Sequence, residues 1–159
     1  MKFTKMHGAG NDYILISCFE YDIPDPSSLS VKMCDRHFGV GGDGIILVCP
    51  SDVADFKMRM FNSLDGSEAG MCGNGIRTFG KYVYDKGLTD KTVITVETLS
   101  GIKTLTLNVA GGKVESVRVD MGRPRLKSSE IPVDSTLERF IAQPVASQGV
   151  TYEMTCVNM

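Results

Sequence analysis

The sequence predicts an α+β fold in which strands wrap around one central helix. Two observations lead to this class. Short apolar runs, such as 45–49 and 93–96, recur between glycine-rich turns, which is typical of strands. A single stretch instead places apolar residues at helical spacing, namely Ile76, Phe79, Gly80, Val83 and Tyr84. We therefore expect one long helix and mostly strands elsewhere.

The first part of the chain contains four expected strands, at 2–7, 13–16, 45–49 and 56–61. A turn-forming cluster at 8–12 separates the first two. After a loop rich in Pro, Ser and Asp, the pair Ser27-Ser28 is expected to cap a helix that runs to about Arg36. A second glycine-rich loop, at 38–44, leads into the third strand.

The central helix is expected to begin near Gly73 and to end at Lys86, with Cys72 at its N-terminal edge. Gly87 suits the C′ position that ends a helix. Three further strands follow, at 93–96, 103–109 and 114–121, and residues 110–112 form a hairpin turn between the last two.

Two domains are expected, at 1–120 and 121–159. The second begins with a polar connector at 124–135, and strand character returns at 151–157. The chain stops on this strand, so we expect the second domain to be incomplete.

Composition excludes several classes of protein. The 159 residues are 42% hydrophobic and carry a formal net charge of -2 without a basic block, so neither nucleic acid nor an anionic membrane is an expected partner. No apolar run reaches the length of a membrane-spanning helix, and the N-terminus lacks the apolar core of a signal peptide. A cytoplasmic protein is expected.

Five cysteines occur, at positions 18, 34, 49, 72 and 156. Their number is odd, and none of them share Cys-x-x-Cys spacing. Neither a disulfide framework nor a zinc site is therefore expected. The thiols should be reduced, and one of them is a candidate for chemistry.

Cys72 is that candidate, because glycines surround it in the segment AGMCGNGIR. A thiol at a helix N-terminus meets unpaired N–H groups and the positive end of the helix dipole, which favour the thiolate. The N–H groups of Gly73, Asn74 and Gly75 can bind a carboxylate. One segment could thus supply a base and an anion site. A lone cysteine is more often a buried structural residue, but this context favours a functional one.

Other polar residues are weaker candidates. Asn11 and Asn62 sit in loops where they could bind a ligand, and turn chemistry alone would also explain them. Arg77 could pair with a loop carboxylate or face solvent. His7 and His37 could in principle partner a cysteine nucleophile, but neither has a distinctive context.

These segments occur in an order that resembles one family. MHGAGND at 6–12, RHFGVGGDG at 36–44, FN at 61–62, DGSE at 65–68 and MCGNGIR at 71–77 follow one another. The chain resembles diaminopimelate epimerase, a family of pyridoxal-phosphate-independent enzymes of lysine and peptidoglycan-precursor synthesis. The resemblance covers the whole chain and is densest up to about residue 122.

The resemblance implies two similar α/β domains with an active site between them and no cofactor. Two cysteines, one per domain, would act on opposite faces of the substrate α-carbon and interconvert LL- and meso-diaminopimelate. Cys72 matches the first cysteine. Gly73 and Asn74 match residues that hold the α-carboxylate, and Asn11 and Asn62 match residues that contact the substrate.

Departures from the family pattern are also visible. The second catalytic cysteine of the family lies beyond residue 159, and Cys156 does not match it. We therefore expect the chain to need a second half as partner and to be inactive alone, and a homodimer stays open. Thr78 replaces a non-catalytic cysteine. The pair Ser63-Leu64 lengthens the loop by one residue, which affects the placement of Asn62.

Three other readings compete with this one. The chain could be another isomerase of the same fold, acting on proline or a phenazine precursor. It could be a cysteine hydrolase, which would need a histidine within hydrogen-bond reach of Cys72. It could also be a fragment that folds without catalysing a reaction.

Overall fold

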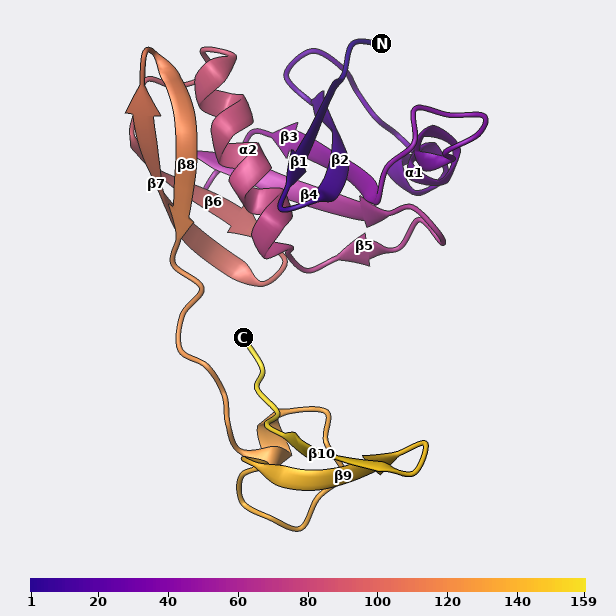
Figure 1. Ribbon diagram of the computed structural model, residues 1–159. Helices are drawn as coiled ribbons and strands as arrows, with labels where there is room; N and C mark the ends of the chain where they lie inside the picture. Colours follow the sequence, from indigo (N-terminus) through magenta and orange to yellow (C-terminus); the bar gives the residue numbers. More distant parts are fainter. The chain divides into compact units, whose positions relative to one another are not determined.

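Residues 1–120 of the computed structural model fold into a curled, eight-stranded mixed sheet and two helices (Figure 1). The structure describes all residues from 1 to 159. In chain order the elements are β1 (Thr4–Gly8), β2 (Asn11–Ser17), α1 (Pro26–Cys34), β3 (Gly44–Cys49), β4 (Phe56–Asn62), β5 (Glu68–Ala69), α2 (Gly73–Asp85), β6 (Val93–Thr98), β7 (Gly101–Ala110) and β8 (Lys113–Val119). Residues 121–159 form a second compact unit.

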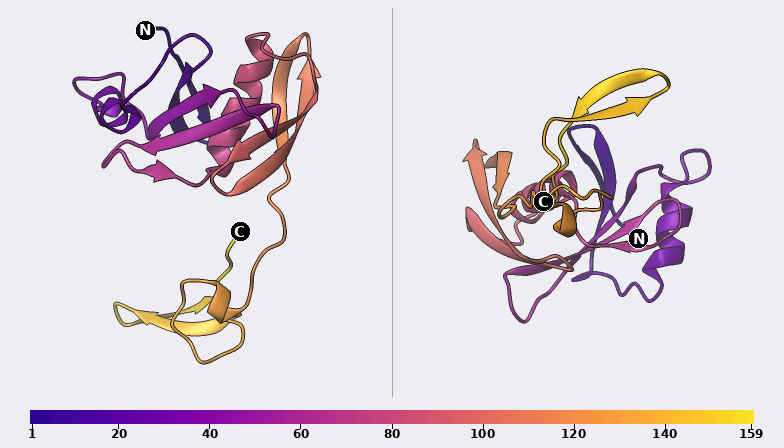
Figure 2. Two further views of the ribbon diagram at one scale, coloured as in Figure 1. Left: turned by 180° about the vertical axis from the view of Figure 1, so that it is seen from behind. Right: turned by 90° about the horizontal axis from the view of Figure 1, so that it is seen from below.

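The sheet wraps around α2. Its strand order is β1-β2-β3-β4-β6-β7-β8, with β5 paired to β4. The β2–β3 and β4–β6 pairs are parallel, and the other neighbours are antiparallel. Helix α2 packs against β1, β2, β3, β7 and β8, whereas α1 lies against β3 and β4. Figure 2 shows this unit from behind and from below. The predicted α+β class, with strands around a central helix, is confirmed.

The two faces of the sheet have separate partners. On one face, Ile16 and Leu47 pack in a cluster that includes Cys34 of α1. On the other face, Ile46 meets α2 at Gly75, where an added Cβ would lie 3.0 Å from the Ile46 side chain. Successive residues of a strand alternate between these faces. This alternation decides which residues reach the N-terminus of α2.

Helix α2 begins at Gly73, as predicted, and ends one residue before the predicted Lys86, which is its C-cap. Its apolar stripe is fully buried at Ile76, Phe79 and Val83. Cys72 is the N-cap, and the helix ends at Asp85. Gly87 adopts a φ of 71°, and Leu88 N–H donates to the Val83 carbonyl, which is the hydrogen bond of a Schellman motif.

The expected start and end of α1 are wrong. Asp25, rather than Ser27-Ser28, is the N-cap, and its side chain accepts a hydrogen bond from the Ser28 N–H at 3.1 Å. Pro26 suits the first helical position because it has no N–H to leave unpaired. The helix ends at Cys34 instead of Arg36.

The second unit contains a hairpin of β9 (Gln143–Ser147) and β10 (Val150–Met154). Gln148 and Gly149 have positive φ values of 51° and 78°, as the tight turn between these strands requires. The prediction missed β9, and β10 ends before the expected residue 157. A short 3-10 helix, η1 (Ser128–Glu130), interrupts the predicted connector.

None of the helices is both long enough and apolar enough to cross a membrane.

Candidate active site

Cys72 lies where β5 and α2 meet, with its sulfur at the start of the helix. Its backbone is extended, with φ -125° and ψ 125°, which turns the side chain back over the first turn. The Gly75 N–H donates to the sulfur at 3.4 Å, and the Ile76 N–H donates to the Cys72 carbonyl at 2.8 Å. The sulfur thus lies at the end of the helix where the backbone N–H groups and the positive end of the helix dipole are found.

Asn11 is brought to the same sulfur. Its side-chain oxygen, Oδ1, lies 3.7 Å from Cys72 Sγ and accepts the thiol hydrogen. Asn11 begins β2 opposite Gly8, the last residue of β1. A Cβ at Gly8 would lie 2.8 Å from the backbone oxygen of Asn74. Glycine there lets the β1–β2 hairpin approach the first turn of α2.

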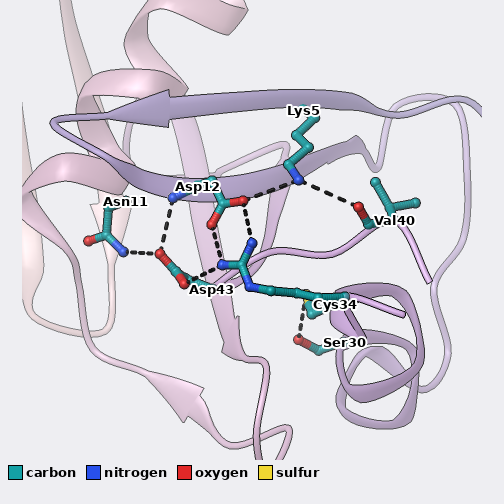
Figure 3. A network of polar contacts seen from close by, with 8 residues as sticks. Lys5, Asn11, Asp12, Ser30, Cys34, Val40 and Asp43 are labelled. Atoms are coloured by element: carbon teal, nitrogen blue, oxygen red, sulfur yellow. Dashed lines mark hydrogen bonds and ion pairs between the residues drawn. The ribbon is translucent and has the colours of Figure 1, made fainter. Parts of the chain in front are cut away.

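Asp43 fixes which end of the Asn11 amide faces the sulfur. The Asn11 Nδ2 group donates to Asp43 Oδ2 at 2.7 Å, and the Asp12 N–H donates to the same oxygen at 3.1 Å (Figure 3). A carboxylate only accepts hydrogen bonds, so the NH₂ group must point toward it. The carbonyl of Asn11 is therefore left for Cys72.

Arg36 holds this arrangement from the α1 side. Its guanidinium donates twice to Asp12, at 2.8 and 3.1 Å, and once to Asp43 Oδ1, at 2.9 Å. The hydrogen bond from Arg36 holds the pKa of Asp12 well below its usual value, and Lys5, 3.1 Å from the same carboxylate, acts in the same direction. The carboxylates of Asp12 and Asp43 are thus tied to one cation.

Successive side chains of β2 point to opposite faces of the sheet, so the residues near Cys72 lie on one face and the ion pair with Arg36 lies on the other. Asn11 and Tyr13 point toward α2, whereas Asp12 points toward Arg36. Tyr13 is 5% exposed, and burial raises the pKa of its hydroxyl, with a smaller contribution from the nearby Cys72. Tyr13 therefore belongs to the surroundings of the thiol.

The remaining predicted residues occupy different positions. Gly73 and Asn74 form the first turn of α2, whose N–H groups precede the first intrahelical bond. Asn62 ends β4 opposite Gly44, on the sheet face that α2 covers. Its amide donates to Ser67 Oγ at 2.8 Å, within its own loop, so the structure does not bring it into contact with Cys72.

Two groups of this segment have partners that the sequence does not indicate. The N–H of Gly75 donates to the Cys72 sulfur. Arg77 is half-buried and makes no ion pair with a carboxylate. It donates instead to the backbone carbonyls of Gly73, at 2.6 Å, and Val117, at 3.3 Å.

Sequence reasoning missed Tyr13, Arg36 and Asp43 as parts of the site. Tyr13 could have been found from its place two residues after Asn11 on a strand, which puts both on one face. The roles of Arg36 and Asp43 depend on contacts between distant segments. No group of three or more His, Cys, Asp or Glu side chains is arranged to hold a metal ion.

The Cys72 sulfur has no hydrogen bond to a histidine. Its hydrogen-bond partners are the Asn11 carbonyl and the Gly75 N–H. Nothing in this arrangement supports a cysteine–histidine hydrolase, which needs the two side chains within hydrogen-bond reach.

Solved structures of low sequence identity share the fold. A phenazine biosynthesis protein of the PhzF family from Bacillus anthracis superposes with a TM-score of 0.60 at 24% identity, over 80% of this chain and 43% of that chain. A probable proline racemase from Agrobacterium radiobacter superposes with a TM-score of 0.65 at 16% identity, over 78% of this chain and 42% of that one.

Sequence relatives are much closer. A diaminopimelate epimerase from Acetivibrio thermocellus is 58% identical over the whole chain, which covers 56% of that protein. One from Methanococcus maripaludis is 57% identical, with 57% of its length covered. The chain thus spans little more than half the length of these relatives. A family model described as diaminopimelate epimerase matches residues 3–127, and the chain therefore belongs to the diaminopimelate epimerase family.

Proposed function

We propose that Cys72 is one of two acid–base groups that interconvert LL- and meso-diaminopimelate without a cofactor. The observation that carries this proposal is the position of its sulfur at the N-cap of α2, between the Gly75 N–H and the Asn11 carbonyl. As a thiolate, Cys72 removes the α-proton from one face of the substrate carbon. As a thiol, it returns a proton in the reverse direction.

The first turn of α2 binds the substrate α-carboxylate in this proposal. The backbone N–H groups of Gly73 and Asn74 lie at the positive end of the helix, beside the sulfur. An amino-acid α-proton is a very weak acid, and these dipoles stabilise the negative charge that develops as it leaves. The first turn of α2 thus places the α-carbon beside the base and also stabilises the carbanion that forms there.

Asn11 and Asn62 complete the substrate contacts. Since Asp43 takes the NH₂ group of Asn11, the Asn11 oxygen is left to accept hydrogen bonds from the thiol and from a substrate ammonium group. Asn62 faces the same side of the sheet and would have to exchange its bond to Ser67 for one to the distal part of the substrate.

Inversion requires a second acid on the opposite face of the carbon. We propose that a second cysteine supplies it from a further half of the protein, as the length of the relatives suggests. With Cys72 alone, a proton can leave and return on one face only. The isolated chain would therefore be inactive as an epimerase, and any exchange of the α-proton would occur with retention of configuration.

The test is incorporation of α-deuterium into LL-diaminopimelate in heavy water, with the chain, its Cys72→Ala variant and a Cys156→Ala control. We expect deuterium to enter with the chain and the control and not with Cys72→Ala. Equal incorporation by Cys72→Ala would overturn the role of Cys72. Formation of the meso isomer would show that residues 1–159 already hold a second acid.

A further inference from the structure

Cys18 and Cys49 form a pair of thiols that the proposed reaction does not use. Cys49 is the last residue of β3, and Cys18 directly follows β2, its parallel neighbour. The Cys18 N–H donates to the Val48 carbonyl at 2.8 Å, which extends the strand pairing to this position. The Cys49 thiol donates to the Cys18 sulfur, and the two sulfurs are 2.8 Å apart.

This geometry suits a covalent link. Neighbouring strands lie about 4.7–4.9 Å apart, within the range of about 4.4–6.8 Å between the Cα atoms of a disulfide. The sulfurs need to approach by less than about 1 Å to reach the bond length of about 2.05 Å. Both side chains pack against the apolar cluster on the α1 face, yet both are only half-buried, so a small oxidant can reach them.

The two thiols are also unequal. The hydrogen bond from Cys49 lowers the pKa of the Cys18 thiol, and the positive charge of Arg59 acts in the same direction. For Cys49, the same hydrogen bond and its burial raise the pKa. Cys18 is therefore the thiol that ionises more readily, and Cys49 lies beside it as the second thiol.

We propose that Cys18 and Cys49 are a site of oxidative modification, at which hydrogen peroxide converts the two thiols into a disulfide that joins β2 to β3. The Cys18 thiolate attacks one peroxide oxygen, the O–O bond breaks, and the products are a sulfenic acid and hydroxide, which is protonated to water. The sulfur of Cys49, on losing its proton, attacks the Cys18 sulfur and expels hydroxide, which becomes a second water. The sulfurs are oxidised, and the peroxide is reduced.

The other cysteines lack this arrangement. Cys34 is 4% exposed and has Ser30 as its hydrogen-bond partner. The sulfur of Cys72 has Asn11 and the Gly75 N–H beside it. Oxidation should therefore select the Cys18–Cys49 pair for the first intramolecular link. This inference is independent of the proposed epimerase function.

The experiment treats the reduced chain with peroxide, blocks the remaining thiols with iodoacetamide and maps tryptic peptides without reduction. Trypsin places Cys18 in residues 6–32, Cys34 in 33–36 and Cys49 in 37–57, so the three thiols are separated. We expect peptides 6–32 and 37–57 to appear joined and to separate on reduction with dithiothreitol. The expected rate of loss of these two thiols is about tenfold faster than that of Cys156.

Two variants sharpen the test. Cys49→Ser should leave Cys18 without a resolving thiol, so that dimedone traps its sulfenic acid on peptide 6–32. Cys156→Ser should keep the link. The proposal is overturned if peroxide leaves both thiols free for alkylation, if it joins another pair first, or if it converts Cys18 to a sulfinic acid without a link to Cys49.

Discussion

The sulfur of Cys72 lies 3.7 Å from the side-chain carbonyl oxygen of Asn11, although 61 residues separate them along the chain. This pair joins the start of β2 to the start of α2. Because Asp43 fixes the direction of the Asn11 amide, the sulfur faces an acceptor on that side and the Gly75 donor on the other. The protonated and ionised forms of Cys72 thus each have a partner, as a group that both takes and gives a proton requires.

Substitution Asn11→Asp should slow alkylation of Cys72 by iodoacetamide about tenfold near neutral pH, because a carboxylate beside the sulfur disfavours the thiolate. The measurement is the rate of modification of the Cys72 peptide by mass spectrometry. Asn108→Asp is the matched control, since Asn108 bonds to Ser116 on β8. An unchanged rate in Asn11→Asp would mean that the two side chains do not meet in solution.

Substitution Asp43→Asn should have the opposite effect. Without the carboxylate, the Asn11 amide can turn its NH₂ group toward the sulfur, and a donor there favours the thiolate. We expect alkylation of Cys72 to become about fivefold faster, the equivalent of one hydrogen bond of about 1 kcal/mol. Asp55→Asn is the control for a general loss of stability of the fold, because it breaks an ion pair with Lys91 that is remote from Cys72. A similar gain in both variants would argue against an orienting role for Asp43.

Substitution Gly8→Ala should separate the β1–β2 hairpin from α2. The new Cβ would lie 2.8 Å from the backbone oxygen of Asn74, which cannot move without disturbing the first turn of the helix. The expected loss in the free energy of unfolding is about 1–3 kcal/mol, measured by urea denaturation. Gly111→Ala, which meets no atom within 4 Å, should cost only the strain of its φ of 57°. Equal losses would contradict this packing.

The contribution of Asp12 to stability should depend on pH. Since its pKa is lowered in the folded chain, from 3.8, the stabilisation is complete above that value and declines as the pH falls toward the lower folded pKa. Asp12→Asn should therefore lose about 1–3 kcal/mol near pH 7 and progressively less below about pH 4. Urea denaturation across this range, with Asp52→Asn as the exposed control, measures the difference. A loss that stays constant with pH would exclude the ion pair as its source.

The helix that carries Cys72 could be predicted because its signals are local. Apolar spacing, the glycines around Cys72 and the C′ glycine at position 87 all lie within one short stretch. The start of α1 is ambiguous in the sequence, because Asp25, Ser27 and Ser28 are all residues that can cap a helix. The proline at position 26 is the signal that favours Asp25 as the N-cap, since proline suits the first helical position.

The surroundings of the thiol could not be predicted in the same way. The contact of Asn11 with Cys72 and that of Asp43 with Arg36 depend on which strands are neighbours and in what register. Neither is visible in local spacing. The hairpin strand β9 was missed because its residues are polar or half-exposed and include Pro144, so the apolar alternation of a strand is weak.

Because side chains of β2 alternate between the two faces of the sheet, the order of Asn11 and Asp12 decides which of them lies beside Cys72. Asn11 reaches the thiol and Asp12 reaches the guanidinium only because they point to opposite faces of one strand. A slip of β2 by one residue against β3 would exchange them. The Asp12 carboxylate would then lie beside the Cys72 thiol, which must ionise, and the neutral Asn11 amide would face Arg36. The pairing of β2 with β3, which fixes this register, therefore decides which charge lies beside the thiol.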